Sequence, residues 1–112
     1  MRCIYLIPVA LTCLGIAAIA AATSHESAGR SGQAVFEANC ANCHTGGFGG
    51  FFTGAPKVGD RKDWQELTPK GVETLTANTL AGFGDMAARG ECTVCSDEEI
   101  RAAVEYMLEQ SQ

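Results

Sequence analysis

Apolar residues form one long block at the start of the chain and spaced patterns after it. The clearest pattern lies near the C-terminus, where apolar residues return at the 3.6-residue period of one helix face: Ile100, Ala103, Val104, Met107 and Leu108. Ser96 and Glu99 precede this run with the spacing of a capping box. The pattern therefore predicts a helix from Asp97 towards Glu109.

Two shorter segments upstream also have helical character. Residues 32–40 predict a short helix that buries Val35 and Phe36, and residues 60–67 predict a helical turn that carries Trp64. Both segments place a large apolar side chain beside polar ones, as expected for helices that pack on one side only.

A further helix is predicted between a capping signal and a pair of glycines. Thr68 can cap this helix with Pro69 at its first position, Leu75 lies on its apolar stripe, and Gly82 and Gly84 end it. The capping signal and the glycines mark the two ends of this helix.

The glycine-rich run 46–54 contains three phenylalanines and predicts a loop. No segment shows the strict alternation of a half-buried strand. The chain is therefore predicted to be all-α, with about four short helices.

The apolar block at the start predicts an export signal over residues 1–22. Arg2 gives it a positive end, and alanines at 20–22 give it a small-residue cleavage site. An uncleaved anchor is the competing interpretation, because 20 uncharged residues can just span a bilayer. We expect a flexible lead-in at residues 23–31 and one domain at residues 32–112, located in an oxidising compartment.

Length and charge exclude several function classes. The chain has 112 residues, eight of them basic and thirteen acidic, and a formal net charge of −5. One domain fits this length, which excludes a multidomain enzyme. Nucleic-acid binders need clustered basic residues, and this acidic chain lacks that composition. About 90 residues make a thin core, so we expect a covalent link or bound group to help fill it.

The strongest chemical signal is the pentapeptide Cys40-Ala41-Asn42-Cys43-His44, the attachment signature of a c-type haem. Two thiols three residues apart can reach the two vinyl groups on one edge of a porphyrin. His44 then follows as the proximal ligand of the iron. The sequence therefore predicts one covalent haem c held by Cys40, Cys43 and His44.

Cysteine spacing leaves two other interpretations open. The first is a zinc site built from the four cysteines outside the predicted export signal: Cys40, Cys43, Cys92 and Cys95. The second is a thioredoxin-like redox pair, although no strand-like stretch precedes Cys40. Cys95 is followed by Ser96 rather than histidine, so a second haem is not expected, and in an exported protein Cys92 and Cys95 predict a local disulfide.

A methionine is the predicted sixth ligand. Met86 lies in an irregular stretch past a helix end, whereas Met107 lies on the apolar face of the last helix and is expected to pack. His25 is the other histidine and falls in the lead-in. Ligation by His44 and Met86 implies a comparatively high potential, and an open, gas-binding sixth site is the alternative.

With these motifs the sequence resembles the class I c-type cytochromes, and in particular the bacterial cytochrome c5 group. The resemblance rests on the haem motif, the segment 54–60, Trp64, Met86, and the Cys92/Cys95 pair before the last helix. It implies the class I cytochrome c fold packed around one haem. The Cys92–Cys95 disulfide would then lie behind the Met86 loop.

The resemblance also implies roles for individual residues. Pro56 would offer its carbonyl to Nδ1–H of His44, and Trp64 would donate its indole N–H to a haem propionate. Gly32 and Phe36 would cross the last helix near residues 103–106.

As a function, the sequence indicates a periplasmic carrier of single electrons that is not an enzyme. Its partners would be redox proteins such as a terminal oxidase or reductase, docking briefly, with membrane contact only if the leader stays uncut as a tether to the inner membrane. The alternatives are a dedicated haem subunit of a larger dehydrogenase or oxidase and, in another class, a zinc-binding cysteine-rich module. For the run 46–54 we hypothesise an apolar docking patch near the haem edge.

Overall fold

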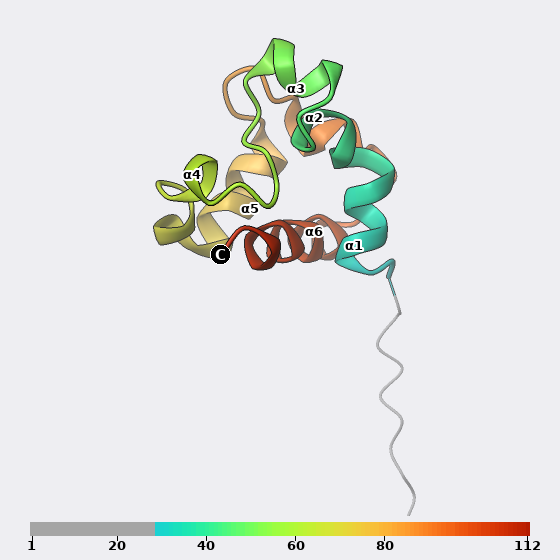
Figure 1. Ribbon diagram of the computed structural model, residues 1–112. Helices are drawn as coiled ribbons and strands as arrows, with labels where there is room; N and C mark the ends of the chain where they lie inside the picture. The colour runs from blue at the N-terminus through green and yellow to red at the C-terminus, as the bar shows by residue number, and fades with distance from the viewer. Residues whose placement is uncertain (1–28) are drawn as a thin grey trace, which may run out of the picture.

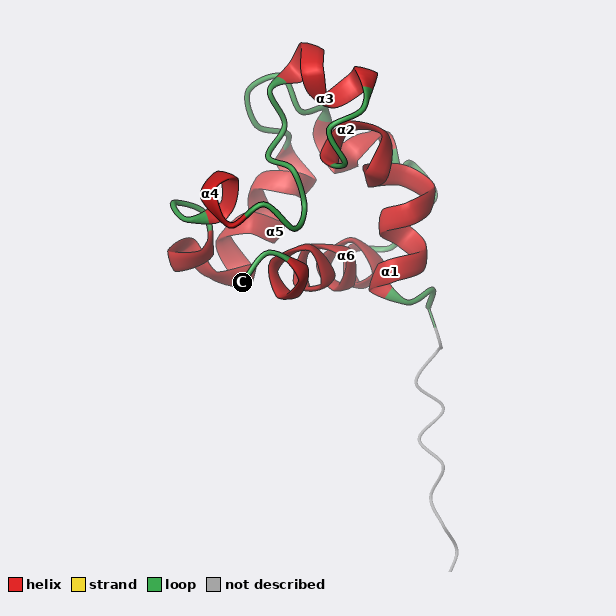
Figure 2. Ribbon diagram, viewed as in Figure 1, coloured by secondary structure: helices red, strands yellow, loops and turns green. Residues whose placement is uncertain are grey.

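The computed structural model describes residues 29–112, and within them the chain is helical (Figures 1 and 2). The predicted export signal and His25 lie outside the described residues. In chain order the elements are α1 (Gly32–Val35), the π-helical turn η1 (Phe36–Cys40), α2 (Ala41–His44), α3 (Phe48–Thr53), α4 (Arg61–Trp64), the 3₁₀ turn η2 (Thr68–Lys70), α5 (Gly71–Ala81), the 3₁₀ turn η3 (Ala88–Glu91) and α6 (Asp97–Gln110). The all-α prediction is confirmed.

Helix α6 is the best-predicted element of the molecule. The Ser96 side chain accepts a hydrogen bond from the Glu99 N–H, and the Glu99 carboxylate accepts one from the Ser96 N–H, so the capping box is complete. All five residues of the predicted apolar face are buried. Three acidic residues in the first turn also suit the positive end of the helix dipole.

Helix α1 crosses α6 at close range, as the resemblance implied (Figure 1). A Cβ at Gly32 would lie 2.1 Å from the carbonyl oxygen of Ala102, so only glycine fits at this crossing. One turn later the rings of Phe36 and Tyr106 pack with centroids 5.4 Å apart. The crossing fixes the segment that leads directly into the cysteine motif.

Two apolar clusters line α6 on either side of this crossing. The larger cluster joins α6 to α4 and α5: Phe36, Trp64, Leu75, Val104, Met107 and Leu108. The smaller one joins α6 to α1 and to the second cysteine pair: Val35, Cys92, Cys95, Ile100 and Ala103. Both clusters are thus centred on α6, and Cys40 and Ala41 of the cysteine motif pack against the larger one.

An ion pair fastens the chain just before α1 to the start of α6. Arg30 donates through Nε and Nη2 to the Glu99 carboxylate at 3.0 Å, and its backbone N–H donates to the same carboxylate at 2.9 Å. These hydrogen bonds lower the pKa of Glu99 to about 2. The guanidinium also lies 3.2 Å from Sγ of Cys95, so it braces the second cysteine pair.

Helix α5 begins differently from the prediction. Thr68 does not cap it: the Thr68 hydroxyl donates back to the Trp64 carbonyl at 3.0 Å, and the short turn η2 comes first with Pro69 near its start. A threonine side chain often prefers such a local carbonyl four residues earlier. The predicted end is correct, because Gly82 stops α5 with φ of +85°.

The glycine-rich run 46–54 is not the predicted loop, because most of it forms helix α3. Its phenylalanines are spaced i, i+3 and i+4, and the rings of Phe48 and Phe52 pack 5.7 Å apart, a pairing that stabilises a helix. Gly54 ends the helix in the left-handed conformation with φ of +64°. The apolar spacing and this C-cap outweigh the low helix propensity of glycine.

No helix within residues 29–112 combines the length and the apolar character needed to cross a membrane.

Candidate functional site

The cysteine motif lies on consecutive helical turns between α1 and α3. Cys40 ends the π-helical turn η1, and Cys43 and His44 belong to α2. A π-helical turn inside a helical run is a frequent mark of a functional site. Burial raises the pKa of the Cys40 thiol, and the nearby Cys43 adds to the rise. Both thiols are unpaired and half-buried.

His44 is buried and held in one orientation. Its Nδ1 lies 2.9 Å from the carbonyl oxygen of Pro56. A carbonyl only accepts, so Nδ1 must carry the proton and donate it. Nε2 is then the ring nitrogen left to bind a metal through its lone pair when the imidazole is neutral. The contact implied for Pro56 is present.

The segment that carries Pro56 is itself tied down on both sides. The Val58 N–H donates to the His44 carbonyl at 2.8 Å, and the Lys57 N–H donates to the Asp63 carboxylate at 2.9 Å. The imidazole therefore has a rigid partner rather than a mobile loop.

Trp64 makes a different contact from the one that the resemblance implied. The indole N–H donates to the carbonyl oxygen of Lys57 at 2.9 Å, and the ring is buried in the larger cluster. Through this hydrogen bond Trp64 supports the segment that orients His44. The donation to a haem propionate that the resemblance implies stays a prediction.

Met86 lies in a tight turn after α5. The backbones of Phe83 and Met86 exchange two hydrogen bonds of 3.0 Å each, and the Met86 side chain is half-buried. Met107, in contrast, is buried in the larger cluster, as predicted for a packing methionine. The structure thus accounts for Met107 through packing and gives Met86 no place in either core cluster.

The second cysteine pair forms a disulfide. Cys92 and Cys95 are bonded, with Cα atoms 5.5 Å apart, and both are buried. Arg89 donates to the Cys95 carbonyl at 2.7 Å, which closes the loop onto η3. The zinc alternative is therefore wrong, because two of its four thiolates are used, and residues 29–112 contain no cluster of three metal-binding side chains.

The donor set of the chain fits a covalently bound haem. The motif supplies two unpaired thiols and an imidazole whose Nδ1 is hydrogen-bonded to Pro56, which leaves Nε2 to bind a metal. Within residues 29–112 one buried side-chain polar atom lacks a partner, Oγ1 of Thr76 on α5. A buried hydroxyl without a partner is the kind of group that a polar atom of a bound ligand would satisfy.

Sequence reasoning missed the close contact between α3 and the motif. A Cβ at Gly50 would lie 2.3 Å from the carbonyl oxygen of Cys43, and one at Gly49 would lie 3.2 Å from Cys43 Sγ. The signal was available: adjacent glycines between phenylalanines at helical spacing indicate a helix that packs against another backbone.

Comparison with known proteins identifies the family. The family model described as "Cytochrome C oxidase, cbb3-type, subunit III" matches residues 27–107. Cytochrome c-555 of Chlorobaculum thiosulfatiphilum is 37% identical over 86 residues, which cover 73% of this chain and 95% of the relative. Cytochrome c5 of Azotobacter vinelandii is 38% identical over 80 residues, which cover 70% of this chain and 92% of the relative.

Two solved structures share the fold at similar identity. The cytochrome c in the crystal structure of an electron transfer complex with nitrite reductase is 33% identical, with a TM-score of 0.65, covering 72% of this chain and 94% of that one. A mono-heme ferrocytochrome c from Shewanella putrefaciens is 32% identical, with a TM-score of 0.60, covering 74% and 96%. The chain therefore belongs to the class I monohaem cytochromes c, the group of cytochromes c5 and c-555, and is an electron-transfer protein with one covalently bound haem c.

Proposed function

We propose that the haem is held by thioether bonds to Cys40 and Cys43, with His44 and Met86 as axial ligands of its iron. The hydrogen bond between His44 Nδ1 and Pro56 is the observation that carries the assignment of the proximal ligand, because it leaves Nε2 to bind a metal. When bound, the haem supplies an iron that alternates between the ferric and ferrous states.

The residues around the motif keep the imidazole in place. Pro56 fixes its tautomer, and Trp64 and Asp63 hold the segment that contains Pro56. A ligand with a hydrogen-bonded, rigid partner needs little rearrangement when the charge on the metal changes. This arrangement suits a protein that accepts and releases single electrons and catalyses no bond change.

The two methionines offer a matched test of the sixth ligand. Met86→Leu is expected to abolish the weak far-red absorption band of a methionine–iron bond and to let the reduced protein bind carbon monoxide readily. Met107→Leu changes a core side chain, and we expect this variant to keep the band and, like the unaltered protein, not to bind carbon monoxide readily. If the Met86 variant retains the band, or if the unaltered protein already binds carbon monoxide readily, the sixth-ligand assignment is wrong.

We infer that the mature chain begins at residue 23, carries the cytochrome domain at 32–112 and works in the periplasm. Its expected partners are a reductase or a terminal oxidase that docks briefly. The structural neighbour crystallised with nitrite reductase supports the first partner class. Mass analysis of the exported polypeptide tests this proposal: it should equal residues 23–112 plus one haem.

A second candidate is a dedicated haem subunit of a larger oxidase. The description of the matching family model, a subunit of a cbb3-type oxidase, favours it. Purification from detergent-solubilised membranes separates the candidates. Elution at fixed stoichiometry with larger subunits supports the dedicated subunit, and elution as a monomer supports the free carrier.

A further inference from the structure

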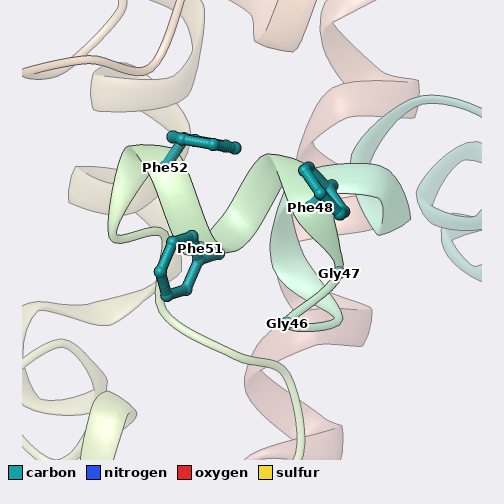
Figure 3. Close-up of a pocket in the computed structure, with 5 residues that line it drawn as sticks. All are labelled: Gly46, Gly47, Phe48, Phe51 and Phe52. Carbon is teal, nitrogen blue, oxygen red and sulfur yellow. The ribbon is translucent and has the colours of Figure 1, made fainter.

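The largest exposed apolar feature of the described chain is helix α3. Phe48, Phe51 and Phe52 are 84%, 82% and 73% exposed. Their rings surround an open hollow of about 430 Å³, which Gly46 and Gly47 also line (Figure 3). Large aromatic rings are costly to leave in water, so such a cluster indicates a surface that is covered in use.

The rings form a preassembled group. Phe51 and Phe52 pack edge to face at 5.5 Å, and Phe48 contacts Phe52 across one helical turn. The glycines of α3 point the other way, against Asn42 and Cys43, where a side chain would collide with the motif. The sequence of α3 thus separates a flat face, which contacts the haem-binding motif, from an aromatic face that projects outward.

This geometry places the aromatic face directly over a haem attachment point. Gly49 comes so near Cys43 Sγ that a Cβ there would lie 3.2 Å from the sulfur. A macromolecule that covers α3 is therefore separated from the Cys43 thioether by one helix without side chains on its inner face. Short distances favour electron transfer, so a partner on this face would be well placed to exchange an electron with the attached haem.

We propose that the aromatic face of α3 is the docking surface for a redox partner protein that presents an uncharged apolar depression. The proposal rests on the haem attachment to Cys43 proposed above. Residues 45–56 contain no charged side chain, so the centre of the interface must be apolar on both sides. The net charge of −5 then acts through the rest of the surface and steers the chain towards basic partners.

Area and charge favour a transient partner over a second copy of the chain. Three rings at these exposures present roughly 350–600 Å², whereas stable complexes bury about 800 Å² on each partner. Two copies with a net charge of −5 would also repel each other. A patch of this size matches the small interfaces of electron-transfer encounters.

A lipid surface fits less well. Helix α3 has six residues, too few for the long amphipathic face of an interfacial helix, and it has no basic residue of its own to bind anionic headgroups. The observations therefore favour a protein as the occupant.

The test compares electron exchange with proteins and with a small oxidant. Holo-protein in which Phe48, Phe51 and Phe52 are all changed to serine is mixed with an extract of the cells that encode the chain, and haem oxidation is followed by stopped-flow absorbance. We expect the bimolecular rate to fall at least about tenfold. Oxidation by ferricyanide, which needs no docking surface, should stay within about twofold of the unaltered protein.

Two matched variants keep the test informative. Val94→Ser removes a similarly exposed apolar side chain, 81% exposed, that lies between Cys92 and Cys95 and does not belong to α3, and this change should leave both rates unchanged. Changing the three phenylalanines to leucine retains an apolar surface and should restore most of the rate. An unaltered visible spectrum shows that each variant is folded and loaded with haem.

The outcomes distinguish a failure of the docking surface from a failure of the proposed carrier function. If the extract fails to oxidise or reduce the unaltered protein while ferricyanide succeeds, the carrier function is wrong. If the extract acts equally on the unaltered and triple-serine proteins, the docking surface is wrong. Phenylalanine-dependent binding to vesicles of phosphatidylglycerol and phosphatidylcholine, or phenylalanine-dependent dimers in sedimentation, would assign the face to lipid or to a second copy and overturn the proposal.

Discussion

The two Cys-x-x-Cys motifs have the same spacing and opposite structures. Cys40 and Cys43 lie on consecutive helical turns with both thiols unpaired, and His44 follows. Cys92 and Cys95 lie in a non-helical loop, bonded to each other, and Ser96 follows. Spacing alone therefore does not decide the chemistry of a cysteine pair: the backbone conformation and the next residue do.

The residue after each pair has a structural reason as well as a chemical one. His44 closes α2 and turns its ring towards Pro56, where one nitrogen is engaged and the other is left free. Ser96 opens α6 and uses its hydroxyl to cap the helix. The residue after the first pair thus presents a ring nitrogen at the end of α2, whereas the residue after the second pair caps the start of α6.

The largest effect is expected when the first motif is made to resemble the second. His44→Ser removes the proposed proximal ligand, and we expect loss of the low-spin visible spectrum and of nearly all folded holo-protein, because a core this small is expected to depend on the bound group. Absorbance and mass analysis of the exported chain measure this. A variant that keeps a normal spectrum would show that His44 is not the ligand.

Breaking the second pair should cost less and leave the haem in place. For a loop this short, Cys92→Ala with Cys95→Ala is expected to lower the free energy of unfolding by about 2 kcal/mol through the lost cross-link. Guanidinium unfolding of the holo-protein measures the loss. A visible spectrum that changes as much as in the His44 variant would mean that the two motifs are not independent.

Trp64→Phe tests the support of the first motif alone. The buried ring is kept, but the Lys57 carbonyl loses its donor, at a cost of about 1–2 kcal/mol in unfolding free energy. Because Lys57 neighbours Pro56, we also expect a measurable shift in the reduction potential. The double alanine variant of the second pair serves as the control whose potential stays unchanged.

The smallest effect concerns the ion pair beside the second motif. The pKa of Glu99 is lowered to about 2 by Arg30, so its contribution to stability is full above its ordinary value of 4.5 and is lost as the pH falls towards 2. Unfolding of the unaltered protein should therefore weaken across this window more than that of Glu99→Gln. Equal pH profiles for the two proteins would show that the ion pair adds nothing.

Much of the scaffold was predictable, because it follows from local rules. The 3.6-residue period and the capping box of α6 are complete in the sequence, and both appear in the structure. Gly32 at the helix crossing and the contact between Pro56 and His44 follow from the family resemblance. Each of these features depends on a few residues whose partners are set by sequence spacing or by the family pattern.

The errors occurred where tertiary contacts decide. Glycine content suggested a loop at 46–54, but packing against Cys43 and the aromatic pairs make it helical. The hydrogen bond from Trp64 to the Lys57 carbonyl, seven residues earlier, was also not predicted. The sequence alone does not show which acceptor a side-chain N–H will use, because that depends on which backbone carbonyls the fold brings close to it.

The hydrogen bonds between Arg30 and Glu99 also fix the place where the described chain enters the domain. They hold the leading end of the described chain against the start of α6, while α3 stands at the opposite end (Figure 1). A protein that covers the aromatic rings of α3 would therefore not contact the segment at which the described chain begins.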